Sequence, residues 1–139
     1  LTPDEYAVMK RHVEYGLEMV NAVCDSKVRQ HDAYQMIHHI IGAHHEMLDG
    51  SGYPNGVEAG DINIFSRIVT VADIFDALTS ERPYKKAWSV DEALYELNEM
   101  VQKNKLDPLC VEALMLYFDN RDEENTTALN LDDKCVISA

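Results

Sequence analysis

The sequence is short of basic residues. Its 139 residues include 12 lysines and arginines against 25 aspartates and glutamates, which gives a formal net charge of −13. This surplus of negative charge disfavours general electrostatic binding to DNA or to an anionic membrane surface. An anionic substrate would therefore have to meet local cations, a bound metal ion, or both.

Cysteines and long apolar runs are also scarce. Cys24, Cys110 and Cys135 are too few and too irregularly spaced for a disulfide framework or a zinc finger, so we expect a reducing, cytoplasmic location. No run approaches about 18 apolar residues, and no basic segment followed by an apolar run stands at the start. Neither a membrane span nor a signal peptide is predicted.

What the chain does contain is apolar residues in helical patterns. Hydrophobic residues make up 46% of the sequence, which is enough to bury the core of one domain. Thr2-Pro3-Asp4-Glu5 and Ser89-Val90-Asp91-Glu92 have the order of capping boxes, which mark helix starts. Capping and the 3.6-residue period predict about five helices, at residues 2–23, 32–49, 64–81, 89–101 and 107–118.

Two segments lie outside this helical pattern. The stretch 49–63 holds four of the six glycines, which is typical of an ordered loop. Beyond Asp119 the apolar period fades into a segment rich in acids and amides. We therefore expect a domain at residues 1–118, followed by an acidic tail at 119–139 that is weakly ordered or contacts a partner.

Several side chains are of the metal-ligand type. His12 lies beside the apolar stripe of the first expected helix, and Asp73 lies in a nearly charge-free stretch of the third. His44 and His45 stand near the end of the second. Imidazole and carboxylate are common ligands of transition metals. Because adjacent helical residues point about 100° apart, His44 and His45 would suit two ions of one cluster, or one ligand and one group that supports it.

Each of these residues also has a structural interpretation. A lone histidine such as His12 is more often packed or solvated than metal-bound. Asp73 could accept hydrogen bonds from a neighbouring helix cap. His44 and His45, with Glu46, could form a polar helix end at which the helix dipole favours imidazole.

The dipeptide His31-Asp32 looks like the metal-binding pair of many phosphohydrolases. If one helix joins it to His44, the two lie about 20 Å apart at 1.5 Å per residue, whereas the ligands of one ion each lie about 2.1 Å from it. We interpret the dipeptide as a helix N-cap, and His38 and His39 as packing or surface residues.

Four segments together resemble the HD-GYP domain, a branch of the HD superfamily of metal-dependent phosphohydrolases. They are "KRH" at 10–12, "HHEMLDGSGYPNG" at 44–56, "SRIVTVADIFDALTSERPYKKA" at 66–87 and "DEAL" at 91–94. The resemblance extends from Leu1 to about Phe118. It implies an all-α, HD-domain-like helical bundle with an ordered glycine-rich loop that contains the Gly-Tyr-Pro motif. It also implies hydrolysis of cyclic di-GMP at two or three metal ions, commonly iron or manganese.

The resemblance assigns roles to ten residues. The implied metal ligands are His12, His44, His45 and Asp73. The implied substrate-binding residues are Asp49, Gly52, Tyr53 and Pro54 in the loop, with Tyr53 facing substrate, and Arg82 and Lys85, which would contact phosphate. The structural alternatives are a turn-packing ring for Tyr53 and a solvated loop for Arg82 and Lys85.

One part of the family pattern is missing. The family's His-Asp pair and the lysine after it lie upstream of the "KRH" segment, as does a further metal-binding histidine or glutamate, and this sequence contains none of them. Because Leu1 stands directly before a helix cap, we expect the chain to be part of a longer protein. By itself it is expected to be weakly active or inactive.

The leading hypothesis is a bacterial, cytoplasmic, metal-dependent cyclic di-GMP phosphodiesterase that acts in signal transduction. Its expected partners are the cyclic dinucleotide and either diguanylate cyclase domains or an upstream sensor or receiver domain, with no DNA or membrane partner. One alternative is a non-catalytic HD-GYP-like module for sensing or protein docking. The other is an HD-type hydrolase of another nucleotide.

Overall fold

The computed structural model describes residues 2–81 and 86–132, with side chains described as far as Arg121. Its α-helices are α1 (Pro3–Lys10), α2 (His12–Val23), α3 (Asp32–Ala43), α4 (Ile64–Thr79), α5 (Val90–Gln102) and α6 (Pro108–Asp132). Two short 3-10 helices, η1 (Val28–Gln30) and η2 (Ala59–Asp61), lie in the connections. Since the described residues form no strand beyond a single β-bridge between Asp49 and Glu58, the expected all-α class is confirmed.

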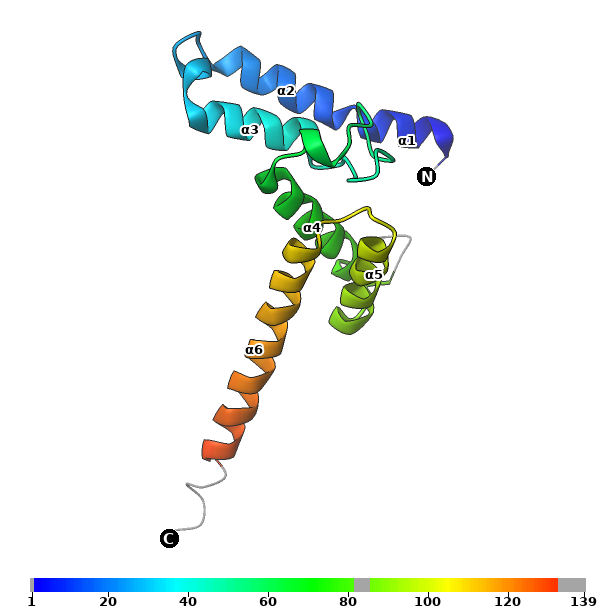
Figure 1. Ribbon diagram of the computed structural model, residues 1–139, viewed down its shortest axis with the longest axis vertical. Helices are drawn as coiled ribbons and strands as arrows, with labels where there is room; N and C mark the ends of the chain where they lie inside the picture. Colours follow the sequence, from blue (N-terminus) through cyan, green and yellow to red (C-terminus); the bar gives the residue numbers. More distant parts are fainter. Residues whose placement is uncertain (1, 82–85, 133–139) are drawn as a thin grey trace.

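The first expected helix is divided into α1 and α2 at Arg11. At its start, the Thr2 hydroxyl accepts a hydrogen bond from the Glu5 amide, while the Glu5 carboxylate accepts one from the Thr2 amide, which confirms the capping box. Arg11 keeps helical dihedral angles, with φ −67° and ψ −10°, so the two helices run nearly in line (Figure 1). The division makes His12 the first residue of α2.

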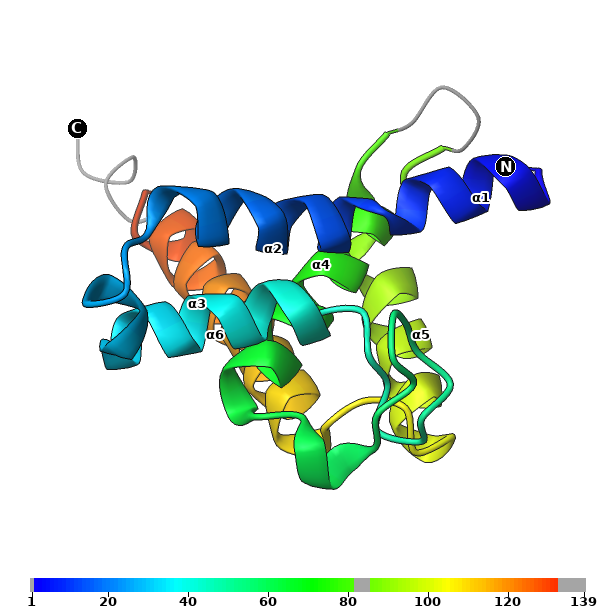
Figure 2. The ribbon, with the colours of Figure 1, turned by 90° about the horizontal axis from the view of Figure 1, so that it is seen from above.

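Helices α2 and α3 form an antiparallel hairpin that lies across α4 (Figures 1 and 2). Their close approach depends on small residues, because a Cβ on Gly16 would stand 2.9 Å from Cγ2 of Ile41. This packing brings the N-terminus of α2 beside the C-terminus of α3, which are distant in sequence.

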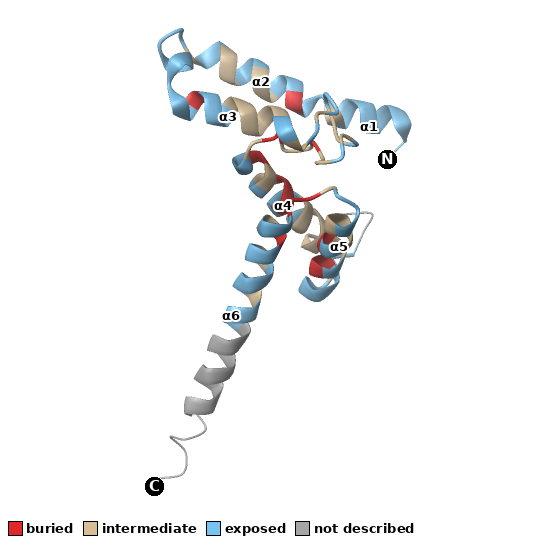
Figure 3. Ribbon diagram, viewed as in Figure 1, coloured by how far each residue is buried: buried red, intermediate tan, exposed pale blue. Residues whose placement is uncertain are grey.

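The hydrophobic core lies where α4, α5 and the start of α6 meet (Figure 3). Its buried residues are Val71, Leu94, Leu97, Leu106 and Val111. Met47, which follows the histidine pair by two positions, packs against this core. The core therefore anchors the segment that leaves α3, and through it the glycine-rich loop.

Two helix ends differ from the sequence-based expectation. The prediction that the second helix continues to Asp49 is wrong, because α3 ends at Ala43 with His44 as its C-cap. Helix α6 runs on to Asp132, although the apolar period fades near Phe118. The division of the chain after residue 118 stays a prediction. Within residues 2–81 and 86–132, no helix combines the length and apolar character that crossing a bilayer requires.

Candidate metal centre

Three histidines bring their ring nitrogens together between α2 and the end of α3. Nε2 of His12 lies 3.4 Å from Nε2 of His44 and 3.0 Å from Nε2 of His45. One nitrogen from each ring lies within 4.8 Å of the other two. Two nitrogens that bind one ion at about 2.1 Å, with an angle of about 90–110°, are about 3.0–3.4 Å apart. The two separations from His12 therefore fit a metal ion that His12 shares with His44 or with His45.

The assignment of His44 and His45 to two ions, or to one ligand and one supporting group, stays a prediction, but its premise is wrong. It assumed helical geometry at both residues, but α3 ends at Ala43 and the two histidines lie in the turn that follows. Their ring centroids are 4.1 Å apart, with an interplanar angle of 40°. Both rings can consequently face His12.

Backbone carbonyls select the tautomer of two of these rings. Nδ1 of His12 lies 2.7 Å from the carbonyl oxygen of Met9. Nδ1 of His44 lies 3.1 Å from that of Ile40 and 3.0 Å from that of Ile41. A carbonyl oxygen can only accept, so each Nδ1 carries the proton. In the neutral rings, Nε2 is then left with a lone pair directed into the cluster, as metal coordination requires.

His45 is held neutral by its surroundings. Burial, and then electrostatic repulsion by His44 with a smaller effect of His12, lower its pKa to about 4, against the opposite effect of the Asp73 carboxylate. At neutral pH the ring is therefore in the form that coordinates metals.

Asp73 approaches the cluster through the other nitrogen of His45. Its Oδ2 lies 3.7 Å from Nδ1 of His45, and its side chain is 49% exposed. Although Asp73 lies in a nearly charge-free stretch of sequence, this face of α4 is open to solvent. The role of Asp73 as a metal ligand stays a prediction.

The glycine-rich loop is anchored by Glu46, which the sequence-based argument missed as a functional residue. Glu46 is only 2% exposed. Its carboxylate accepts hydrogen bonds from the amides of Asn55 at 2.7 Å, Gly56 at 3.1 Å and Val57 at 3.2 Å. A buried carboxylate requires several donors. In the sequence, Glu46 directly follows two ligand-type residues and precedes a loop whose backbone amides need acceptors. This position was the signal that could have identified it.

Gly52 lies directly on the backbone of the segment that carries the histidines. A Cβ at this position would stand 2.4 Å from Cα of Glu46, 2.5 Å from the carbonyl oxygen of His45 and 2.5 Å from the amide nitrogen of Met47. This close approach leaves no room for a β-carbon at position 52. Its contact with substrate stays a prediction.

Tyr53 packs against His45. Its amide donates a hydrogen bond to the carbonyl oxygen of His45 at 3.1 Å, and the two rings stack with centroids 4.6 Å apart and an interplanar angle of 23°. Burial raises the pKa of Tyr53 to about 12, with smaller contributions from Tyr6 and Asp73. The following residue, Pro54, is exposed and joined by a cis peptide bond. Whether Tyr53 and Pro54 contact substrate stays a prediction.

Asp49 connects the loop to the α5–α6 connection. Its carboxylate accepts hydrogen bonds from the amide and hydroxyl of Ser51 and lies 3.2 Å from Nζ of Lys105. The Ser51 hydroxyl and then its amide lower the pKa of Asp49 to about 2, against a smaller effect of burial, with further help from Lys105. Its contact with substrate stays a prediction.

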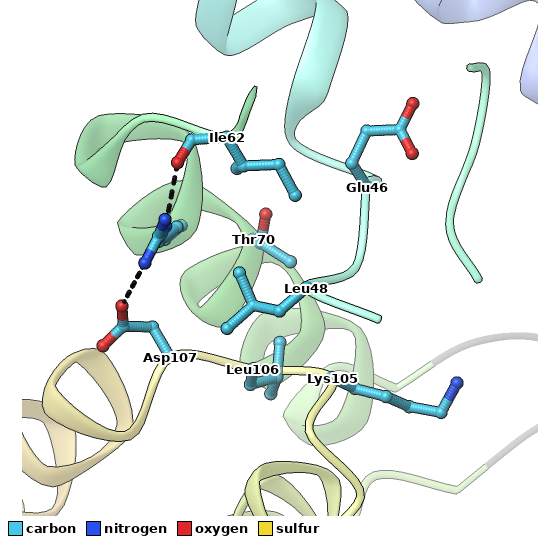
Figure 4. Close-up of a pocket in the computed structure, with 8 residues that line it drawn as sticks. Glu46, Leu48, Ile62, Thr70, Lys105, Leu106 and Asp107 are labelled. Atoms are coloured by element: carbon cyan, nitrogen blue, oxygen red, sulfur yellow. Dashed lines mark hydrogen bonds and ion pairs between the residues drawn. The ribbon is translucent and has the colours of Figure 1, made fainter. Parts of the chain in front are cut away.

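Two further residues hold the backbone around the site. The Thr70 hydroxyl lies 2.9 Å from the carbonyl oxygen of His44. The Arg67 guanidinium donates to the carbonyls of Ile62 and Ala59 and to the carboxylate of Asp107, as Figure 4 shows in part. Beside these groups is a cavity of about 10 Å³, roughly the room that one water molecule needs.

The remaining histidines have structural contacts. His31 caps α3, because its Nδ1 accepts a hydrogen bond from the Ala33 amide at 3.3 Å, which confirms the N-cap interpretation. His38 packs beside Tyr34, and Nε2 of His39 accepts from the Asn63 amide at 3.4 Å. Of the two interpretations of His38 and His39, as packing or as surface residues, these contacts favour packing.

The phosphate contacts expected at Arg82 and Lys85 lie outside the described residues.

Comparison with known proteins gives a consistent set of relatives. The family described as "HD domain" matches residues 1–109. The cyclic di-GMP phosphodiesterase response regulator RpfG of Xanthomonas campestris pv. campestris is 47% identical over 116 residues, which cover 83% of this chain and 29% of that protein.

Two further relatives have similar coverage. The 3'3'-cGAMP-specific phosphodiesterase 2 of Vibrio cholerae serotype O1 is 42% identical over 120 residues, which cover 86% of this chain and 22% of that protein. A cyclic di-GMP phosphodiesterase of Thermotoga maritima is 39% identical over 115 residues, which cover 83% of this chain and 29% of that protein. The chain thus spans 22% to 29% of the length of these three relatives.

Proposed function

The chain belongs to the HD domain family of metal-dependent phosphohydrolases and to its HD-GYP branch, and we propose that it forms part of the active site of a cyclic dinucleotide phosphodiesterase. The observation that carries this proposal is the convergence of Nε2 of His12, His44 and His45. Protonation of Nδ1 in His12 and His44 keeps two of these nitrogens available as ligands.

His12, His44 and His45 would hold a divalent transition metal ion, with Asp73 completing the ligand set. Iron or manganese is the metal that we propose, and two or three ions would be present in the complete site. Imidazole with carboxylate suits such ions. When bound, the metal lowers the pKa of water and neutralises negative charge on a phosphoester.

The other residues would shape the site and receive the substrate. Glu46 fixes the loop, and Gly52 allows the loop to lie against the histidine-bearing segment. Tyr53 covers one face of the His45 ring and excludes water there. Asp49 and Pro54 would complete the loop side of the substrate pocket, while Arg82 and Lys85 would contact phosphate.

Cyclic di-GMP is the substrate that we propose first, because two of the three relatives described above are named for it. The second candidate is 3'3'-cGAMP, which the name of the relative with 42% identity favours. The name "response regulator" of the 47% identical relative supports an upstream receiver domain as a partner. Diguanylate cyclase domains are a further proposed partner, and the proposed location is the cytoplasm.

The test uses the full-length protein, purified without oxygen and loaded with iron or manganese. Metal content and hydrolysis are measured with cyclic di-GMP, with 3'3'-cGAMP and with a simple phosphodiester. We expect bound metal and turnover of a cyclic dinucleotide, both strongly reduced in His44→Ala and retained in the control His38→Ala. Absence of both metal and turnover would contradict the proposal, and nucleotide binding without turnover would favour a non-catalytic sensing module.

A further inference from the structure

A lysine beside the histidine cluster is held by aromatic rings. Lys10 is the last residue of α1, two positions before His12, and is half-buried. Its Nζ lies 4.9 Å from the ring centroid of Tyr6 and 5.6 Å from that of Tyr53. Because Tyr53 also stacks on His45, one ring is in contact with both the ammonium group and the proposed metal ligand.

The charge of Lys10 is not neutralised by a carboxylate within the described part of the chain. Other cations of this region have acidic partners there: Arg11 pairs with Glu14, Arg67 with Asp107, and Lys105 with Asp49. The Lys10 ammonium group contacts the two tyrosine rings instead. Aromatic faces attract a cation without cancelling its charge.

A free positive charge at this place has a chemical use. The chain carries a net charge of −13, so an anionic ligand meets repulsion unless a local cation offsets it. An ammonium group is a point charge with three donors, well suited to phosphate oxygens. The two rings restrict the side chain of Lys10, which lowers the entropy lost when it binds a ligand.

We propose that Lys10 binds a phosphate group of the cyclic dinucleotide, and that Tyr6 and Tyr53 position its ammonium group for this contact. The inference rests on the proposed function, because it adds a substrate-binding residue to the same site. Lys10 acts on substrate binding and is no ligand of the metal. Its removal should therefore change KM and leave metal content intact.

The test compares KM, kcat and metal content of the full-length protein and its Lys10→Met variant, with the cyclic dinucleotide that the wild type hydrolyses. A charge-assisted hydrogen bond contributes enough that its loss should raise KM about tenfold or more. Lys10→Arg should recover part of the loss. The matched control is Lys103→Met, which removes the same charge from an exposed position at the end of α5 and should leave KM near the wild-type value.

A second pair of variants tests the positioning role of the ring. Tyr6→Phe keeps the aromatic face and Tyr6→Leu removes it, so KM should rise more in Tyr6→Leu. Far-ultraviolet circular dichroism checks that each variant keeps the wild-type helix content, and Lys10→Gln replaces Lys10→Met if the latter is unfolded.

The outcomes separate the two proposals. If the wild type hydrolyses a cyclic dinucleotide but KM is the same for the Lys10 and Lys103 variants, the role of Lys10 is overturned and the proposed function stands. A metal-loaded wild type without turnover overturns both. A loss of metal in Lys10→Met would also overturn the substrate-binding role.

Discussion

Nε2 of His12 lies 3.0 Å from Nε2 of His45, although 33 positions separate the two residues in the sequence. The contact arises because α2 and α3 are antiparallel, so that the first residue of α2 meets the turn after α3. The contact with the Met9 carbonyl places the proton of a neutral His12 ring on Nδ1, which leaves a lone pair on Nε2, and a low pKa favours the neutral form of His45. A cation shared by the two nitrogens would satisfy both.

Metal binding should therefore stabilise the fold. Manganese at about 100 times its Kd should add about 2.7 kcal/mol to the free energy of unfolding, which corresponds to a rise in Tm of roughly 5–20 °C. Differential scanning calorimetry with and without a chelator measures this rise. It should disappear in His45→Ala and persist in His38→Ala; an equal rise in both variants would contradict a site at His45.

Replacing Gly52 should destabilise the protein strongly. In Gly52→Ala the new methyl group would meet backbone atoms 2.4–2.5 Å away, which cannot move independently of the histidine segment. We expect a loss of about 2 kcal/mol or more in the free energy of unfolding, measured by urea denaturation. Gly60→Ala is the matched control, because no heavy atom lies within 4 Å of its added Cβ. Equal losses in the two variants would show that the close packing at Gly52 is not the cause.

Glu46→Gln should loosen the loop without changing side-chain volume. The Gln side chain has one acceptor oxygen, whereas Glu46 uses both carboxylate oxygens to receive three backbone amides. At least one of these three backbone amides would lose its acceptor, which should lower the free energy of unfolding by about 1–3 kcal/mol. Hydrogen exchange of the Asn55, Gly56 and Val57 amides should accelerate. The control is Glu112→Gln, on the exposed face of α6, which should leave these exchange rates unchanged. Exchange in Glu46→Gln as slow as in wild type would refute the anchoring role.

Asp49 should make stability depend on acid pH. Its pKa in the folded state is about 2, below the ordinary value of 3.8, so the unfolded chain binds the proton more readily. The contribution of Asp49 is complete above about pH 4 and is lost as the pH falls through about 2. Urea denaturation at several pH values should show wild type losing stability relative to Asp49→Asn over this window.

Ser51→Ala serves as the companion variant, because it removes the hydroxyl that contributes most to this pKa shift. In Ser51→Ala, the loss of stability at acid pH should be smaller than in wild type. Parallel curves for wild type and Asp49→Asn from pH 5 to pH 2 would be incompatible with the assignment.

Local signals in the sequence were sufficient for much of the fold. The capping boxes at Thr2 and Ser89 form as expected, because their hydrogen bonds join residues only three positions apart. The loop around Gly52 was also foreseeable, because residues 49–63 hold four of the six glycines. These features depend on neighbours along the chain and on residue type.

The sequence by itself determined where most of the helices begin, the family and the set of candidate ligands. The tertiary structure decided which nitrogens meet, because the end of α3 at Ala43 turns His44 and His45 toward His12. It also decided that Glu46 is buried and that Asp73 is exposed. These outcomes depend on how separate helices pack. The interactions responsible join residues that are far apart in the chain, and the periodicity of the sequence carries no information about them.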